Sequence, residues 1–237
     1  MEITAAQYER IAPVLPIQRG NVKLSNLQVL NAILYVAEQG CQWRGLPARF
    51  GNWHTVYTRM NRWSKNGVID RVFEHLQREQ IVRIKLEAVA MDSTIVKSIG
   101  KSRGGWSTKI HMVAADARTA ITFSLSPGQA HDAPEGRKLL TRLGPQRPGL
   151  SLLMDRAYEG NETRQLALAL GFMPVVPPLS TRVHPWAYDR EIYQRRNQIE
   201  RLFRRPKGFS RIFSRFEKLD VLFLGFISFA LILDALR

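Results

Sequence analysis

The chain has 237 residues, of which 45% are hydrophobic, so it can bury a sizeable core and is not intrinsically disordered. Its 35 Lys and Arg against 20 Asp and Glu give a formal net charge of +15, which favours a polyanionic partner, either nucleic acid or an anionic membrane. The single cysteine excludes an internal disulfide framework and a cysteine zinc site, and it suits the cytoplasm.

Residues 1–85 are predicted to form a helical domain. Ser25 is placed to cap a helix whose apolar residues recur at helical spacing, and Asn52 is placed to cap a second. A third helix is expected after Gly67. Three short helices joined by tight turns are typical of a helix-turn-helix module, which commonly docks on DNA.

Two arginines of the second predicted helix, Arg59 and Arg62, are candidate DNA contacts. Positive side chains on such a module neutralise phosphates and release counterions. The alternative is that they are solvated charges on an ordinary helical bundle, and the sequence leaves both interpretations open.

Residues 86–237 are predicted to form a mixed α/β domain. The expected order is three strands, a helix, a strand, a helix, a strand and a helix, with an antiparallel start. The Gly104-Gly105 pair is expected in the connection between the first two strands. The predicted strands cover residues 87–92, 109–114, 120–125, 150–154 and 172–176, and the predicted helices cover residues 134–143, 161–170 and 189–205.

The most apolar run, residues 221–233, is predicted to be a buried C-terminal helix. It is shorter than the roughly 20 residues that span a bilayer, and acidic residues bracket it. The first residues lack the basic and then apolar layout of a signal peptide. We therefore expect a cytoplasmic protein without a membrane partner.

Two carboxylates, Asp92 and Asp155, directly follow apolar strand runs. Residues at strand ends line the functional edge of an α/β sheet, so these side chains meet if their strands are neighbours. Carboxylates at close quarters repel unless a cation holds them, and Mg²⁺ prefers such oxygen ligands. Each aspartate alone is equally well explained as a turn residue or a helix cap.

A third acidic candidate, Glu200, lies in the strongly basic stretch 188–215. It is adjacent to Ile199 and therefore sits beside the apolar face of the predicted helix. One interpretation is a structural glutamate paired with arginine. The other is a metal ligand flanked by phosphate-binding arginines, among them Arg201 and Arg204.

The spacing Tyr193, Arg196, Glu200 and Lys207 resembles the signature around the catalytic glutamate of one branch of bacterial insertion-sequence DDE transposases. The resemblance extends over nearly the whole chain. It is carried further by Met91-Asp92-Ser93-Thr94, Asp155-Arg156-Ala157-Tyr158, Asn197-Gln198-Ile199-Glu200-Arg201 and, near the N-terminus, Gly40-Cys41-Gln42-Trp43-Arg44-Gly45-Leu46-Pro47.

The resemblance implies a ribonuclease H-like sheet flanked by helices, with the helical domain before it. It implies that Asp92, Asp155 and Glu200 are the catalytic metal ligands and hold two Mg²⁺ or Mn²⁺ ions. It further implies that Tyr193, Arg196 and Lys207 contact DNA near the scissile phosphate. Other polar residues match no metal-binding position of the family and are expected to be structural: Asp116, Asp132, His111 and His131.

The implied function is that of a transposase. It would bind the terminal inverted repeats of its element as a homodimer on double-stranded DNA, cleave there, and join the freed 3′ end to target DNA at the bacterial nucleoid. Two alternatives remain, a ribonuclease H-like nuclease and a catalytically dead DNA-binding regulator. The fold alone does not separate them.

The chain departs from the family pattern at Pro206. A proline inside a helix removes one hydrogen bond and disfavours helical geometry at the residue before it. We therefore expect the helix to end or kink between Glu200 and Lys207, which puts the reach of Lys207 in doubt.

Overall fold

The structure is a computed structural model that describes residues 2–81, 86–102 and 105–236. Its first four α-helices are α1 (Ala5–Ile11), α2 (Asn26–Gln39), α3 (Trp53–Lys65) and α4 (Val68–Ile81). Ser25 caps α2 with a capping box, and Asn52 caps α3 by accepting from His54 N–H. Short 3₁₀ turns lie between α1 and α3 (Ala12–Val14, Trp43–Gly45 and Ala48–Phe50). The predicted N-terminal helices and their caps are therefore confirmed.

The chain divides into two compact units. Unit 1 contains residues 1–79, 97–106 and 205–237, and unit 2 contains residues 80–96 and 107–204. The last residues thus fold with the first ones, a grouping that the order of sequence motifs does not reveal. The functional domain boundary near residue 85 stays a prediction.

Helix α10 (Asp220–Leu236) supplies much of the core of unit 1. It packs against α3, and a side chain at Gly225 would collide with Ser64, since an added Cβ would lie 2.2 Å from its Oγ. The predicted burial of the apolar run is confirmed. Among the described helices, none is long and apolar enough to cross a membrane. Unit 1 also holds α9 (Ser210–Phe213) and β6 (Ser214–Arg215), which pairs with β1.

Unit 2 is built on a mixed sheet. The strands of the sheet are β1 (Ala88–Ser102), β2 (Gly105–Ala114), β3 (Ala120–Pro127), β4 (Leu150–Met154) and β5 (Phe172–Val175), and unit 2 holds all of them except the end of β1 and the start of β2. They lie in the order β3-β2-β1-β4-β5, with β2 and β3 antiparallel and β1, β4 and β5 parallel. Three sequential strands followed by two parallel ones is the arrangement expected for a ribonuclease H-like sheet, so the predicted fold class is confirmed.

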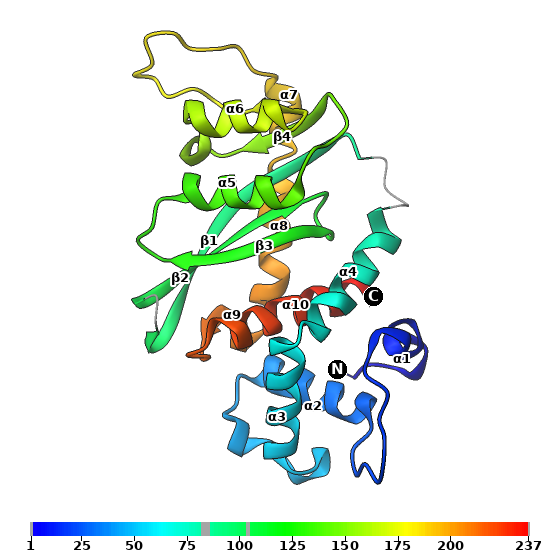
Figure 1. Ribbon diagram of the computed structural model, residues 1–237. Helices are drawn as coiled ribbons and strands as arrows, with labels where there is room; N and C mark the ends of the chain where they lie inside the picture. Colours follow the sequence, from blue (N-terminus) through cyan, green and yellow to red (C-terminus); the bar gives the residue numbers. More distant parts are fainter. Residues whose placement is uncertain (1, 82–85, 103–104, 237) are drawn as a thin grey trace. The chain divides into compact units, whose positions relative to one another are not determined.

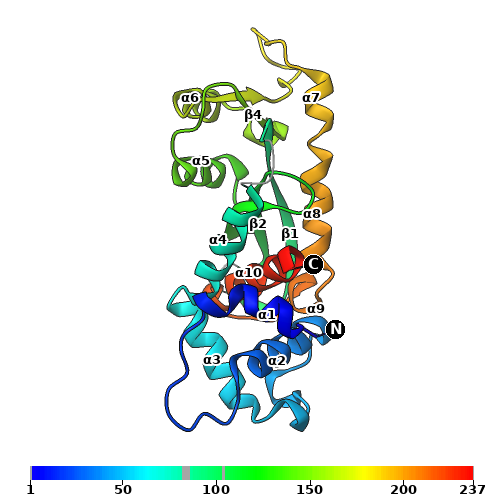
Figure 2. The same cartoon turned by 90° about the vertical axis from the view of Figure 1, so that its right-hand side faces the viewer.

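Helices cover both faces of this sheet. Helices α5 (Asp132–Leu143) and α6 (Asn161–Ala169) lie on one face, and α7 (Arg190–Gln194) leads into α8 (Asn197–Lys207) on the other (Figures 1 and 2). The central strand β4 is buried along nearly its whole length, as expected for a parallel strand covered on both faces. Its side chains join α5, the 3₁₀ turn Arg156–Tyr158 and β5 in one apolar cluster.

Three predictions about these elements were wrong. Strand β1 continues far beyond residue 92, to Ser102. The predicted helix over residues 189–205 is broken at Arg195 and Arg196, where backbone hydrogen bonds from each N–H reach back only three residues. Gly105 begins β2 instead of lying in the preceding connection, and Gly104 lies outside the described residues.

The predicted end of the helix between Glu200 and Lys207, caused by Pro206, was also wrong. Helix α8 continues through Pro206 to Lys207, so it neither ends before the proline nor leaves Lys207 outside the helix. The physical reason is position, because a proline in the final turn forfeits a single hydrogen bond immediately before the helix would end. The break that does occur lies before Glu200, at Arg196.

Truncating the buried side chain of Leu152 in β4 should destabilise unit 2. Leu152 is fully buried, so Leu152→Ala is expected to lower the free energy of unfolding by about 2–5 kcal/mol, measured by urea denaturation. Met173→Ala, on the neighbouring strand but 56% exposed, is the matched control and should change it by less than about 1 kcal/mol. Equal losses for both variants would contradict the assigned core.

Candidate active site

The parallel pairing of β1 with β4 places the two aspartates side by side. Met91 is in register with Met154, so Asp92 and Asp155 are the next residues on adjacent strands that run in the same direction. Asp92 Oδ1 accepts a hydrogen bond from Ser93 N–H at 2.7 Å. The carboxylate of Asp155 accepts one from Arg156 N–H. The predicted pairing of the two strands is therefore observed, although Asp92 lies inside β1 and not at its end.

The carboxyl of Asp92 is buried, with 9% of the residue exposed. Burial raises its pKa to about 6, and the negative charges of Asp155 and Glu200 act in the same direction. The hydrogen bond from Ser93 N–H and the positive charge of Arg196 partly offset that rise. The three acidic residues therefore influence one another electrostatically.

Arg196 joins two of the three acidic residues. Its Nη1 lies 2.6 Å from Asp92 Oδ2, and its Nη2 lies 2.9 Å from Glu200 Oε1. Arg196 stands at the break between α7 and α8, four residues before Glu200. A single guanidinium thus neutralises a carboxylate of the sheet and a carboxylate of the helix.

Glu200 is on the exposed side of α8. Its side chain is 50% exposed, whereas the neighbouring Ile199, Leu202 and Phe203 are buried. The helix is therefore fixed by its apolar face, which leaves the carboxylate of Glu200 accessible beside Arg196.

The donor chemistry of these residues fits a divalent cation, although the carboxylates do not converge. Within the described part of the chain, no three acidic, histidine or cysteine side chains are close enough to hold a metal ion together. Arg196 instead provides the positive charge for Asp92 and Glu200. All the candidate ligands are carboxylate oxygens, which is the set that Mg²⁺ and Mn²⁺ prefer.

The residues predicted to contact DNA are distributed over both units. In unit 2, the ring of Tyr193 lies 5.8 Å from the Arg196 guanidinium and packs edge-on against Tyr188. Arg201 and Arg204 are exposed on α8.

In unit 1, Arg59 and Arg62 lie on α3 as predicted, and Lys207 is the last residue of α8. Arg59 donates to Leu24 O at 3.0 Å and packs on Trp63, so part of its role is structural. Arg62 is exposed. Lys207 is partly buried, which lowers its pKa.

Two arginines of the basic stretch, Arg211 and Arg215, are buried inside unit 1. Arg211 pairs with Glu217 at 2.8 Å, and Arg215 pairs with Asp220 at 2.5 Å. They are therefore structural, and counting charges along the sequence overestimates the DNA-facing surface. Arg211 packs beside the ring of Phe216, and Arg215 packs beside the ring of Phe223.

The two acidic residues that were predicted to be structural, Asp116 and Asp132, have partners within the protein. Asp116 caps a turn by accepting from Arg118 and Thr119 N–H, and Asp132 pairs with Lys109 at 2.6 Å.

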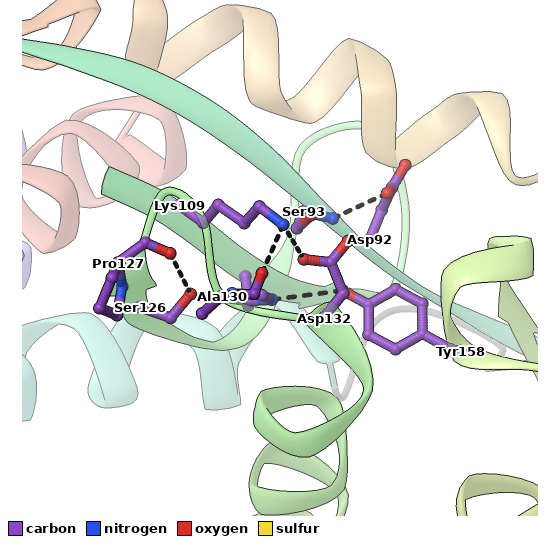
Figure 3. Close-up of polar contacts among 9 residues, drawn as sticks. Asp92, Ser93, Lys109, Ser126, Pro127, Ala130, Asp132 and Tyr158 are labelled. Atoms are coloured by element: carbon purple, nitrogen blue, oxygen red, sulfur yellow. Dashed lines mark hydrogen bonds and ion pairs between the residues drawn. The ribbon is translucent and has the colours of Figure 1, made fainter. Parts of the chain in front are cut away.

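Of the two histidines, His131 is exposed before α5, whereas His111 is fully buried. The ring of His111 lies between Tyr158 and Ser126 (Figure 3). Treating His111 as an ordinary polar residue overlooked this connection. Its place on an apolar strand in register with Ser124 gave no chemical signal.

Two family descriptions match this chain. Residues 83–233 match the family "Transposase DDE domain", and residues 3–73 match "Putative transposase of IS4/5 family". The chain belongs to the DDE transposase family. The transposase is therefore an enzyme of DNA cleavage and transfer, as the sequence motifs predicted, and its family depends in general on divalent metal ions.

Relatives of the transposase include insertion-element proteins. It is 36% identical over 120 residues to "Uncharacterized protein y4sN" of Sinorhizobium fredii, which covers 48% of this chain and 81% of the relative. It is 30% identical over 132 residues to "Putative transposase for insertion sequence element IS6501" of Brucella ovis, which covers 55% of this chain and 98% of the relative.

Among solved structures, the transposase is similar to piggyBac transposase in a synaptic complex with hairpin DNA. The TM-score is 0.39 at 10% identity, over 76% of this chain. The match spans half of the piggyBac chain, so this likeness does not bear on the chemistry of the site.

The raised pKa of Asp92 predicts how stability depends on pH. Because the carboxyl ionises near pH 4 when unfolded and near pH 6 when folded, the stability that its protonated form contributes is lost as the pH rises between these values. Asp92→Asn cannot ionise. Its free energy of unfolding, relative to the wild type, should therefore rise by up to about 3 kcal/mol between pH 4 and pH 7. Urea denaturation across this range tests the prediction, and a difference that does not change with pH would contradict it.

Proposed function

We propose that the transposase binds the terminal inverted repeats of its own insertion sequence and uses Asp92, Asp155 and Glu200 for metal-dependent strand cleavage and strand transfer. The observation that carries the proposal is the register of β1 and β4, which juxtaposes two aspartates, together with the Arg196 bridge from Asp92 to Glu200.

These three carboxylates would hold two Mg²⁺ or Mn²⁺ ions, which supply Lewis-acid activation of a water or hydroxyl and stabilise the charge that develops on the phosphate. The aspartates provide rigid ligands because Asp92 lies within β1 and Asp155 directly follows β4. Glu200 provides a more mobile ligand on an exposed helix face.

Arg196 has two roles in this proposal. In the protein without DNA, its guanidinium neutralises Asp92 and Glu200. Once those carboxylates serve as ligands, the guanidinium is free to bind a phosphate oxygen of the transposon end, since arginine pairs with phosphate as well as with carboxylate. Tyr193 packs beside Arg196 and would approach the same phosphate.

The wider DNA interface would be formed by cations of α8 and α3. Arg201, Arg204 and Arg62 are the exposed candidates, and the partly buried Arg59 and Lys207 extend the set. Two transposon ends must be brought together and joined to target DNA, so we propose that a homodimer forms on the DNA, at the bacterial nucleoid.

The proposal is tested with a labelled duplex that carries the terminal repeat of the element, in the presence of Mg²⁺ or Mn²⁺. We expect cleavage at the repeat boundary and joining of the 3′ end to a second DNA. Asp155→Ala should abolish both reactions while repeat binding persists, because it removes a ligand without altering the basic surfaces.

Other outcomes would favour the alternatives. Cleavage without joining by the wild type would indicate a ribonuclease H-like nuclease. Repeat-specific binding without cleavage would indicate a regulator that has lost catalysis. Undiminished cleavage by Asp155→Ala would refute the assigned ligands.

The exposed arginines of α8 give a quantitative prediction. If Arg201 neutralises a DNA phosphate, Arg201→Gln should reduce the slope of log K against log salt by about 0.9, because one counterion fewer is released. Fluorescence anisotropy with the repeat duplex at several salt concentrations measures this slope. Arg118→Gln, also exposed but in the turn before β3, is the control and should leave the slope unchanged.

A further inference from the structure

A chain of hydrogen bonds runs through the buried interior of unit 2, next to the two aspartates. The Tyr158 hydroxyl lies 3.3 Å from His111 Nδ1, and His111 Nε2 lies 2.7 Å from Ser126 Oγ (Figure 3). Both rings are fully buried. Buried polar groups of this kind are retained only where their hydrogen bonds are satisfied, so the arrangement fixes both rings.

One tautomer of the neutral His111 ring satisfies all of these groups. Its Nε2–H donates to Ser126 Oγ, whose own proton goes to Pro127 O at 3.3 Å, and its Nδ1 accepts from the Tyr158 hydroxyl. Burial lowers the pKa of His111 and raises the pKa of Tyr158, which is consistent with a neutral ring and a protonated hydroxyl.

Tyr158 connects the two segments that carry the aspartates. Its backbone N–H donates to Asp155 O at 2.9 Å, which closes the turn after β4. Its side chain belongs to the same apolar cluster as Met91 of β1, the residue directly before Asp92, and its hydroxyl meets His111 of β2. One tyrosine therefore packs with the strands beside Asp92 through its side chain and closes the turn that begins at Asp155 with its backbone.

The ring of Tyr158 is held in place by packing as well. A Cβ added to Gly136 of α5 would lie 2.6 Å from Tyr158 Cε1 and 3.1 Å from Met91 Cε. Helix α5 thus approaches the ring closely because residue 136 has no side chain. Met91 immediately precedes Asp92, so the ring of Tyr158 and the strand residue before Asp92 belong to one packed cluster.

We propose that Tyr158, oriented by His111, is a positioning residue that fixes Asp92 and Asp155 relative to each other for binding of the divalent cation. This inference rests on the proposed function of those two aspartates. Tyr158 does not touch the ion. It acts through its packing with Met91, through His111 of β2 and through the turn that begins at Asp155.

The test is a titration of the full chain with Mn²⁺, in which electron paramagnetic resonance measures the concentration of the free ion. Tyr158→Phe keeps the ring and its packing against Gly136 but removes the hydroxyl. We expect Mn²⁺ affinity to fall by about 10- to 100-fold, as it does when groups that orient metal ligands are removed. Tyr35→Phe, the same chemical change in α2, is the control and should bind Mn²⁺ like the wild type.

A second variant provides an independent test in case Tyr158→Phe does not fold. Ser126→Ala touches neither aspartate and leaves Tyr158 intact, but it removes the acceptor that fixes the His111 tautomer. It should weaken Mn²⁺ binding several-fold while the circular dichroism spectrum stays that of the wild type. Thermal denaturation of each variant accompanies the titration.

The outcomes separate the two proposals. If Asp155→Ala binds Mn²⁺ as tightly as the wild type, the assigned ligands are wrong and the proposed function fails. If Asp155→Ala loses binding while folded Tyr158→Phe and Ser126→Ala keep wild-type affinity, the ligands stand and the positioning role is overturned. A lower melting temperature with unchanged affinity would likewise show that the hydrogen bonds are only structural.

Discussion

The functional site depends on one feature of strand pairing, the parallel register that sets Met91 opposite Met154. A slip by one residue would turn every side chain of the strand to the opposite face, so Asp92 and Asp155 meet only in this register. The register is secured by the buried strand β4, whose apolar residues are covered by helices on both faces. The apolar core therefore places two charged groups together that would otherwise repel each other.

The negative charge that this strand pairing brings together is partly compensated by a positive side chain of the same protein. Burial disfavours the charged form of Asp92, and nearby carboxylates add to the effect. Arg196 partly offsets both by pairing with Asp92 and Glu200. Removing either partner of such a pair leaves a charge uncompensated, which is why the arginine and the acids have to be considered as one unit.

Much of this arrangement could be predicted from local patterns. The caps Ser25 and Asn52 and the strand over residues 150–154 follow from short-range physical rules, and the structure agrees with them. The acidic residues could be assigned because three motifs occur in family order. What could not be predicted depends on tertiary contacts, such as the break at Arg196 and the continuation of β1 to Ser102.

The same limit applies to individual charged and polar residues. The sequence offered Arg211 and Arg215 as members of a basic stretch, yet both are buried with acidic partners. His111 carried no signal, because its partners Tyr158 and Ser126 are distant in sequence and meet only when β2, β3 and the turn after β4 assemble. Hydrogen bonds of high sequence separation are invisible to periodicity and spacing.

The packing of α10 in unit 1 bears on how the protein is made. Gln7 and Arg10 of α1 donate to carbonyls of Leu236 and Ala235, and Ser228 donates to Asp70 of α4. On the ribosome, the first helices therefore emerge long before the helix that completes their core. Unit 2, whose segments lie between, has all its residues available earlier, and because domains generally fold as units it would fold first. The N-terminal helices would then stay incompletely packed until α10 has left the ribosome, which delays any function that needs them until that point of synthesis.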